Sequence, residues 1–329
     1  MSRQFSIDPS TRNALATIHP QLTEATAVET FMLLAWSMLA PAGDKLAALF
    51  IKSLGATNAM LRITEGITAE ELSASTGTTL FEARGALDRW SAPTSFDHVA
   101  EAIQLAAADN VRLLTSASPE WPTTKFHALE RVEAAPLVLW AKGDLSLLAN
   151  DSVAFAGARA ATGYGSHITA ELVTALDNLT IVSGIAYGIE ATALRAALAN
   201  GQPQVAVLAS GIDRPYPRSH ESLHNRISEK GLLVTEFAPG TVPTRWRFLA
   251  KNRLIAALAN TTIITEAGRN SGSLNLAGWA RQLGKPVGAV PGPITSAAST
   301  GCHWLISAAG ANLVTSAEDV LHLVDATSD

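Results

Sequence analysis

The hydrophobic and polar positions of this chain follow two different patterns. Over residues 1–110 apolar side chains recur at helical spacing, most clearly in 27–40 and 42–54, which Pro41 separates. After residue 151 short apolar runs alternate with helical stretches. Such alternation is typical of a parallel sheet that is covered by helices on both faces. The pattern therefore predicts the α/β class: a doubly wound, mostly parallel sheet with a helical N-terminal domain.

The helical N-terminal domain is predicted over residues 1–110. Two capping boxes, at 68–71 and 79–82, each start a short helix, and Gly77 lies between them. This pattern suits a SAM-like or helix-turn-helix-like module. The acidic balance of the region argues against recognition of bases, so a plain helical module is the simpler interpretation.

The α/β domain is predicted over residues 111–316, followed by a short helix in 317–329. Strand-like runs at 111–114 and 137–140 are expected to add edge strands to the sheet, and a long loop is expected over 237–250. The strands predicted for the main sheet are 152–156, 180–182, 204–208, 232–235, 262–265 and 287–289, and the helices between them are 166–176, 190–199, 219–229, 251–258 and 274–283.

The net charge of −5 over 329 residues argues by itself against a nucleic-acid partner. The charge is unevenly distributed, however. Residues 151–293 hold 13 Lys and Arg against 9 Asp and Glu, and no acidic residue lies between Glu236 and Glu266. Because a local basic strip can bind phosphates in an acidic protein, the distribution keeps a nucleic-acid partner open.

The cellular compartment is predicted from the cysteine content and from the absence of an apolar signal region or membrane-spanning stretch in the sequence. The single cysteine, Cys302, excludes an internal disulfide framework and a cysteine-based zinc site. The chain opens on no apolar signal region, and its most apolar early run is about ten residues long, whereas a membrane span needs about 20. A cytoplasmic protein without a membrane partner is therefore expected.

Glycine-rich loops follow two successive predicted strands. Gly157 and Arg159 come after the first strand, and Ser183, Gly184 and Gly188 come after the second. Glycines let a backbone approach a phosphate, and the helix start that follows offers free N–H groups. Because parallel strands end at one edge of a sheet, the two loops together indicate a phosphate site there. The alternative is that these glycines only form tight turns.

A basic and aromatic strip begins before the helix predicted at 251–258. Cations can meet phosphates, and a ring can stack on an unpaired base, although both rings can equally be core residues beside a solvated loop. The strip contains, in order, Arg245, Trp246, Arg247, Phe248, Lys251, Asn252 and Arg253.

The fifth predicted strand is followed by Ser271, Gly272 and Ser273 at the start of another helix. Small hydroxyl residues in that position form an anion site or an ordinary helix cap. Glu236 and Glu266, at two other strand ends, are interpreted as anchors for loop N–H groups rather than as a carboxylate pair.

The sequence predicts no catalytic residue, cofactor or metal site. Ser183 has no His or Lys partner nearby in the sequence. Cys302 and His303 are adjacent, and such neighbours rarely share the geometry of a catalytic dyad. A Walker-type phosphate loop is absent from the sequence.

In this order, the strand-end motifs resemble the DNA-processing protein A (DprA/Smf) family over about residues 112–314. Each motif is unspecific alone, and the set is specific. The motifs are Pro119-Glu120-Trp121-Pro122, Lys142-Gly143-Asp144, Gly157-Ala158-Arg159, Ser183-Gly184-Ile185-Ala186-Tyr187-Gly188-Ile189, Gly211-Ile212-Asp213, Tyr216-Pro217, Glu236, Lys251-Asn252-Arg253-Leu254-Ile255-Ala256, Glu266-Ala267, Ser271-Gly272-Ser273-Leu274 and Val290-Pro291-Gly292.

The resemblance implies an extended Rossmann-like fold that is often dimeric, binds single-stranded DNA and helps to load the recombinase RecA during natural transformation. It implies that Arg159 is the DNA-binding arginine and that Arg245 and Phe248 are the basic and base-stacking residues. The 251–253 run would match the Arg-Asn-Arg of the family, and the 271–273 loop would hold backbone phosphate. A winged-helix domain, which some members carry, is not expected here.

The chain departs from the family pattern at several positions. Glu190 stands where the family usually has Asp, and Ala193-Leu194 replaces Ala-His. Gln202-Pro203-Gln204 lacks the lysine of the usual Gly-Lys, and Ala250 replaces an arginine. The missing cations predict a weaker affinity for DNA or a different ligand.

Two functions are compatible with these patterns. The leading hypothesis is a non-enzymatic protein that binds and protects incoming single-stranded DNA and hands it to RecA. The alternative is a nucleotide-binding sensor, or an enzyme acting on nucleoside phosphates, of the same Rossmann-like superfamily. The Pro-Gly-Gly-x-Gly-Thr loop of the phosphoribohydrolases in that superfamily is absent from the sequence.

Overall fold

The computed structural model describes residues 7–92 and 95–326, and a nine-stranded sheet lies at the centre of this part of the chain. The strand order is β1-β2-β6-β5-β4-β3-β7-β8-β9, with parallel neighbours from β6 to β9 and an antiparallel edge at β1 and β2. The predicted α/β class is confirmed. The strands are β1 (Arg112–Leu114), β2 (Leu139–Gly143), β3 (Ser152–Gly157), β4 (Thr180–Ser183), β5 (Gln204–Val207), β6 (Leu232–Thr235), β7 (Thr261–Glu266), β8 (Val287–Ala289) and β9 (Asn312–Leu313).

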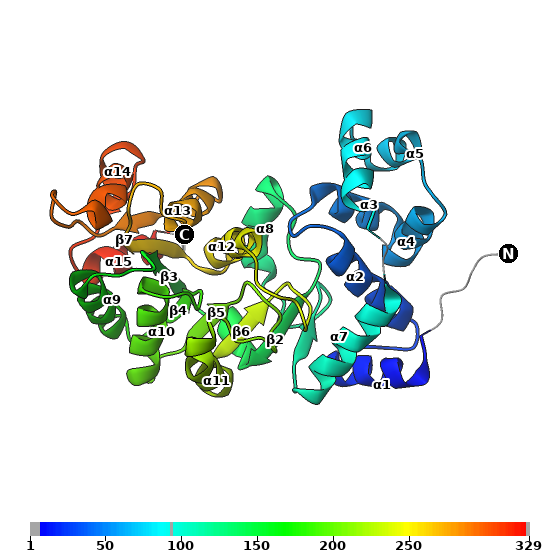
Figure 1. The fold of residues 1–329 in the computed structure, drawn as a ribbon, viewed down its shortest axis with the longest axis horizontal. Helices are drawn as coiled ribbons and strands as arrows, with labels where there is room; N and C mark the ends of the chain where they lie inside the picture. Colours follow the sequence, from blue (N-terminus) through cyan, green and yellow to red (C-terminus); the bar gives the residue numbers. More distant parts are fainter. Residues whose placement is uncertain (1–6, 93–94, 327–329) are drawn as a thin grey trace.

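Helices cover both faces of the sheet, and a separate group of helices precedes it (Figure 1). The preceding helices are α1 (Pro9–Ile18), α2 (Ala27–Leu39), α3 (Lys45–Leu54), α4 (Ala56–Thr64), α5 (Ala69–Thr76), α6 (Leu80–Arg89) and α7 (Phe96–Ala108). The others are α8 (Thr123–Val132), α9 (Gly163–Ala175), α10 (Ile189–Ala199), α11 (Glu221–Lys230), α12 (Arg245–Leu258), α13 (Ser273–Gln282), α14 (Thr300–Ala308) and α15 (Ala317–Asp325), with short 3-10 helices η1 (Leu145–Leu148), η2 (Arg218–His220) and η3 (Ala297–Ser299).

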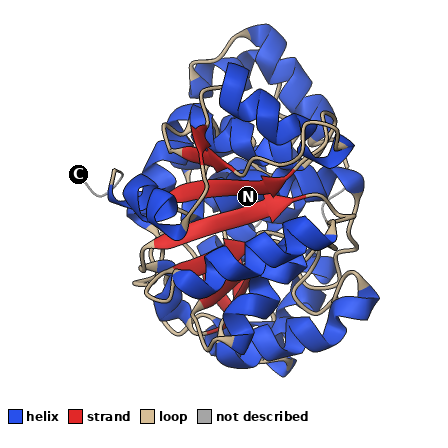
Figure 2. Ribbon diagram, turned by 90° about the vertical axis from the view of Figure 1, so that its left-hand side faces the viewer, coloured by secondary structure: helices blue, strands red, loops and turns tan. Residues whose placement is uncertain are grey.

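Alternate residues of the central strands enter different cores. In β3, Val153 and Phe155 pack with residues of α9, α10 and α15, whereas Ala154 and Ala156 pack with residues of α12 and α13. Successive side chains of a strand point to opposite faces of the sheet. Because helices cover both faces, the side chains on both must be apolar. This explains why the strands are continuous apolar runs in the sequence, and Figure 2 shows the sheet enclosed by helices.

The N-terminal helices pack against the antiparallel side of the sheet. One hydrophobic core contains Trp36 of α2 together with Trp140 of β2 and Leu233 of β6. The capping boxes of α5 and α6 are both formed, and Gly77 ends α5 in the left-handed conformation at φ 68°. The helical N-terminal region is thus built as its sequence predicts, and the boundary proposed at residue 110 remains a prediction.

The fold differs from the sequence prediction at β9, at α8, which lies between the edge strands where no helix is predicted, and at the start of α12. The six predicted strands of the main sheet agree with the structure to within one residue at each end, but β9 was not foreseen because it has only two residues. The long loop expected over 237–250 is also wrong in its second half, since α12 already begins at Arg245. Thr244 caps the helix by accepting a hydrogen bond from the Arg247 backbone N–H at 3.2 Å. The prediction failed because arginines alternate with aromatic residues in the first turn of α12, and this period of two hides the helical period.

Lys285 connects the end of α12 to the amino side of the sheet. Its ammonium Nζ lies 2.5 Å from the carbonyl oxygen of Ala257 and 2.6 Å from that of Ala259. Burial lowers the pKa of Lys285 from its ordinary value to about 7. A neutral amine still has two N–H groups, enough for the two carbonyls.

This lowered pKa predicts a dependence of stability on pH. Between the folded pKa of about 7 and the unfolded value of about 10.5, the unfolded chain holds the proton of Lys285 and the folded chain does not, so the free energy of unfolding rises with pH. The contribution is at most about 1.4 kcal/mol per pH unit. Urea unfolding at several pH values in this window should therefore show that the free energy of unfolding rises less steeply with pH in Lys285→Met than in the native chain. Lys230→Met removes an exposed lysine and serves as the control. Equal slopes in the Lys285→Met variant and the native chain would contradict the prediction.

Candidate nucleic-acid interface

The parallel strands end at one edge of the sheet, where their order reverses. The chain winds outward from β3 through β4 and β5 to β6 on one side, and from β7 through β8 to β9 on the other. Open α/β sheets bind ligands at the carboxyl ends of the strands, next to such a reversal. The loops after β3, β4, β5 and β7 and the start of α12, which follows β6, therefore form the candidate site.

The start of α9 is occupied by a carboxylate of the protein. Glu266, at the end of β7, accepts hydrogen bonds from the backbone N–H of Thr162 at 2.9 Å and from its hydroxyl at 2.7 Å. A Cβ atom at Gly165 would lie 2.5 Å from Glu266 Oε2, so only glycine admits the carboxylate. Because helix starts attract anions, the Glu266 carboxylate lies where the start of α9 favours a negative charge. The interpretation of Glu266 as a loop anchor is confirmed.

The loop after β4 encloses a buried ion pair. Lys251 of α12 extends under this loop, and its Nζ lies 2.8 Å from Glu190 Oε2 of α10. The same carboxylate oxygen accepts the backbone N–H of Ala186 at 3.0 Å. A Cβ atom at Gly184 would lie 1.6 Å from Lys251 Nζ, so this glycine provides the space for the pair. Ser183 is buried, and its hydroxyl donates to the carbonyl of Phe155 at 2.6 Å.

The other predicted glycines also make close internal contacts. A Cβ atom at Gly157 would lie 2.6 Å from Cγ1 of Ile189. Gly188 has φ +75°, and a Cβ atom there would lie 2.1 Å from the carbonyl oxygen of Ala158. The space beside both glycines is thus filled by the protein itself, as it is beside Gly184.

Phe248, in the first turn of α12, is the centre of a group of cations and aromatic rings. The guanidinium carbon of Arg159 lies 4.8 Å from the centre of its ring, and Lys251 Nζ lies 5.5 Å from it. The ring of Tyr216 meets Phe248 edge-on at 5.7 Å. Arg159 and Tyr216 are exposed, and so is Arg245 at the helix start. The structure therefore brings Arg159, Phe248 and Lys251 together and leaves a cation and an aromatic ring open to solvent.

Two further predicted site residues point into the protein. Asn252 donates to Asn275 Oδ1 at 3.0 Å. Arg253 is almost fully buried, where it binds the carboxylate of Glu236 and donates to the carbonyl of Ala134 at 3.0 Å. The interpretation of Glu236 as an anchor for loop N–H groups is therefore wrong. Burial raises the pKa of Glu236, and the charge of Arg253 opposes this increase.

The 271–273 loop lies at the start of α13. The hydroxyls of Ser271 and Ser273 lie 2.7 Å apart, and Ser273 is buried. Gly272 is exposed, and its carbonyl accepts from Asn252 at 3.4 Å. Asn252 thus joins α12 to this loop, and the start of α13 faces solvent at Gly272.

Sequence reasoning missed two contributors to the site. Tyr216 stood only as part of a Tyr-Pro motif, and Glu190 only as a departure from a family pattern. The signal that could have found Glu190 is the need of a buried lysine for a carboxylate partner. Trp246 was left open between core and surface, and its exposed fraction of 49% places it at the surface.

The structure shows the surroundings of Cys302 and His303 and of possible metal ligands. Among residues 7–92 and 95–326, no group of three His, Cys, Asp or Glu side chains could hold a metal ion. Burial raises the pKa of the Cys302 thiol to about 12, which keeps it protonated. His303 turns instead to the carbonyl of Gly292 at 2.9 Å.

The helices were also compared with the requirements of a membrane span. In the part of the chain that the structure describes, no single helix is long and apolar enough to cross a membrane. The pair α3 and α4 meets the length and composition only when taken together, and it bends by 109°.

Comparisons with known proteins agree on one family. The sequence profile of the DNA recombination-mediator protein A family matches residues 112–325. A DNA processing protein DprA from Mycobacterium tuberculosis is 42% identical over 305 residues, which is 88% of this chain and 74% of the relative. The DprA of Streptococcus pneumoniae is 41% identical over 194 residues, 59% of this chain and 68% of the relative.

Solved structures show the same relationship. The X-ray structure of DprA from Streptococcus pneumoniae superimposes with a TM-score of 0.65 at 31% identity and covers 84% of this chain and 96% of that one. DNA processing protein A from Helicobacter pylori, a structure described for its single-stranded DNA binding mode, has a TM-score of 0.58 at 26% identity and covers 64% of this chain and 94% of that one.

The space beside Gly184 gives a test of the ion pair beneath the site. Gly184→Ala should lower the free energy of unfolding by about 3 kcal/mol, the scale for disrupting a buried ion pair, because the new Cβ displaces Lys251 from Glu190. Gly278→Ala is the matched control, since a Cβ there meets nothing within 4 Å, and it should be neutral or stabilising. Chemical unfolding measures both. A native-like stability of Gly184→Ala would show that the pair does not need this space.

Proposed function

The chain belongs to the DNA recombination-mediator protein A family, and we propose that it binds single-stranded DNA without acting as an enzyme. The observation that carries the proposal is the group of Arg159, Phe248 and Tyr216 at the carboxyl edge of the sheet. An exposed cation beside aromatic rings suits a phosphate and an unpaired base of one strand. The Helicobacter pylori relative, whose structure is described for its single-stranded DNA binding mode, supports the same ligand.

The structure favours a strand over a free nucleotide as the ligand. In folds of this class a nucleotide phosphate lies on the start of the helix that follows the first strand of the parallel part of the sheet, here β3. Here that helix is α9, and Glu266 fills its start. A second anion there would be repelled by the carboxylate. We therefore assign the ligand to the outer surface that Arg159, Phe248 and Arg245 form.

A non-enzymatic role is consistent with the state of the nucleophiles. The Cys302 thiol is buried, with a raised pKa, and the Ser183 hydroxyl is engaged with a backbone carbonyl. The Cys302 thiol also donates to a backbone carbonyl, that of Ile264 at 3.5 Å, and Ser183 is fully buried. We assign the site to binding alone.

The proposal extends to the partners of the family. We propose that the chain acts in the cytoplasm as a homodimer, protects incoming single-stranded DNA and helps to load RecA onto it. The description of the family as recombination mediators supports this role. Sedimentation at several protein concentrations tests the dimer. Assembly of RecA filaments on DNA coated with a single-strand binding protein tests the loading.

Removing Arg159 should weaken the contact with phosphate. The Arg159→Ala variant should bind a single-stranded oligonucleotide about tenfold more weakly, on the scale of a charge-assisted hydrogen bond. The slope of log affinity against log salt should become shallower by about 0.7 for one lost phosphate contact. Arg281→Ala removes an equally exposed charge near the end of α13, a helix that starts at the carboxyl edge and runs away from it. Mobility shifts that are the same for Arg159→Ala and the native chain would refute the assignment of this site.

Phe248 should contribute by stacking rather than by charge. The Phe248→Leu variant keeps an apolar side chain at the start of α12 but loses the aromatic face, which is worth about 1–3 kcal/mol per stacked base. We expect a lower affinity for the oligonucleotide with an unchanged salt slope, measured by fluorescence anisotropy. A native affinity in this variant would mean that no base stacks on Phe248.

A further inference from the structure

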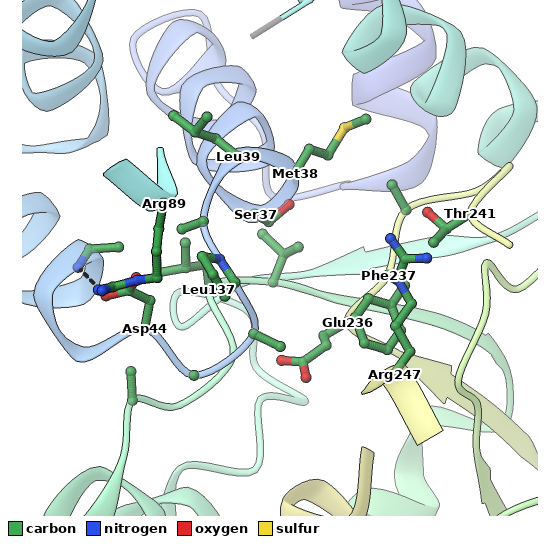
Figure 3. A pocket seen from close by; sticks show the side chains of 18 of the residues that line it. Ser37, Met38, Leu39, Asp44, Arg89, Leu137, Glu236, Phe237, Thr241 and Arg247 are labelled. Atoms are coloured by element: carbon green, nitrogen blue, oxygen red, sulfur yellow. Dashed lines mark hydrogen bonds and ion pairs between the residues drawn. The ribbon is translucent and has the colours of Figure 1, made fainter. Parts of the chain in front are cut away.

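A cleft of about 650 Å³ lies between the helical N-terminal region and the α/β region, and the interface proposed above does not use it. Phe248 lines a different, smaller pocket together with Tyr216 and Lys251. Figure 3 shows the two walls of the cleft, with Glu236, Phe237 and Arg247 on one side and Asp44 and Arg89 on the other. The cleft is therefore bounded by residues of both regions.

One cation in the wall of the cleft lacks a counter-ion. The Arg247 guanidinium lies over the ring of Phe237 at 5.5 Å, and its Nη1 donates to the carbonyl of Val242 at 2.7 Å. Within the described residues, Arg247 forms no ion pair, and its Nε has no hydrogen-bond partner. Arg89 on the opposite wall is different, because Asp44 neutralises it at 3.0 Å. Burial lowers the pKa of Arg247, as expected for a charge that water solvates poorly. An anion would supply what Arg247 lacks.

The neighbouring groups suit a nucleotide base. Trp246 also borders the cleft and is half-exposed, so that its ring is available for stacking. The Glu236 carboxylate forms part of the same wall, and its buried Oε1 has no hydrogen-bond partner among the residues that the structure describes. Every DNA base presents at least one N–H group to such an acceptor. The cleft thus combines a cation for a phosphate with a ring and an acceptor for a base.

The first turn of α12 separates the cleft from Phe248. Trp246 and Phe248 are two residues apart, which places them about 200° apart around the helix axis. The helix start between them carries exposed Arg245 and backbone N–H groups that favour a phosphate. A strand that crosses this helix start would place one base on Phe248 and another in the cleft.

We propose that the cleft holds a second unpaired base of the same DNA strand, with the phosphate on Arg247 and the base against Trp246. This inference rests on the proposed function and extends it. It makes the helical N-terminal region one wall of the DNA site, although that region has an acidic composition. The single strand then bends over the start of α12 between two aromatic positions.

The test is the dependence of affinity on oligonucleotide length. Fluorescence anisotropy with oligothymidylates of increasing length should show that the native chain gains affinity until the strand reaches both positions. Ala42→Trp fills the cleft from the α2–α3 turn, away from Phe248, and Arg247→Gln removes the cation. Both variants should match the native chain on the shortest oligonucleotides and bind the longer ones about tenfold more weakly.

Controls separate the possible outcomes. Arg281→Gln removes a charge outside the cleft and should keep the native length dependence, and melting temperatures show whether each variant is folded. If Ala42→Trp does not fold, the comparison of Arg247→Gln with Arg281→Gln still tests whether the cleft contributes to the affinity for longer oligonucleotides. Native affinity of the folded cleft variants at every length would overturn the cleft assignment. Failure of the native chain to bind any oligonucleotide would overturn the proposed function, and the cleft proposal with it.

Discussion

The buried ion pair between Lys251 and Glu190 fixes the arrangement on which the rest of the site depends. A charge taken out of water must be paired, and the loss of one partner is costly. The pair joins α12 to α10 beneath the loop at Gly184. Arg253, two residues farther along, holds the other side of α12 through Glu236. Together these contacts set the rotation of α12 about its own axis. That rotation places Phe248 beside Arg159 on one side of the helix start and Arg247 in the cleft on the other. The buried cations Lys251 and Arg253 thus fix the orientation of α12, and this orientation determines where Arg247 lies.

The fold was largely predictable from the sequence because strands buried on both faces must be apolar throughout. The six main strands illustrate this rule. The family resemblance was also visible in the sequence, and the comparisons confirm it. The candidate site was less predictable, because a sequence shows that a residue is charged and not which way it points. Arg253 and Arg159 look alike in the sequence, yet one is buried against Glu236 and the other is exposed. The glycines were correctly placed at strand ends, but the atoms that need their space are those of Lys251, Ile189 and Ala158, which come from distant parts of the chain or from the facing loop.

Glu266 distinguishes this site from a nucleotide site built on the same kind of sheet. Open α/β sheets bind ligands where the strand order reverses, and beside β3 and β7 of this protein the Glu266 carboxylate is bound to Thr162. We therefore propose a binding surface that lies farther out, on side chains of α12 and of the loops after β3 and β5. Exposed cations and aromatic rings suit a single strand, because they can contact its phosphates and its unpaired bases. The same outward position brings the helical N-terminal region within reach of a bound strand.

The central claim is that this surface binds the strand through its phosphates and unpaired bases and does not bind a single nucleotide. Competition against a labelled oligothymidylate at two salt concentrations tests it most directly, with unlabelled oligothymidylate, a duplex and thymidine monophosphate as competitors at equal phosphate concentration. The single strand should compete best, the mononucleotide should not compete, and the affinity should fall steeply as salt rises. Displacement by the mononucleotide as effectively as by the strand, or an affinity that does not change with salt, would contradict the claim.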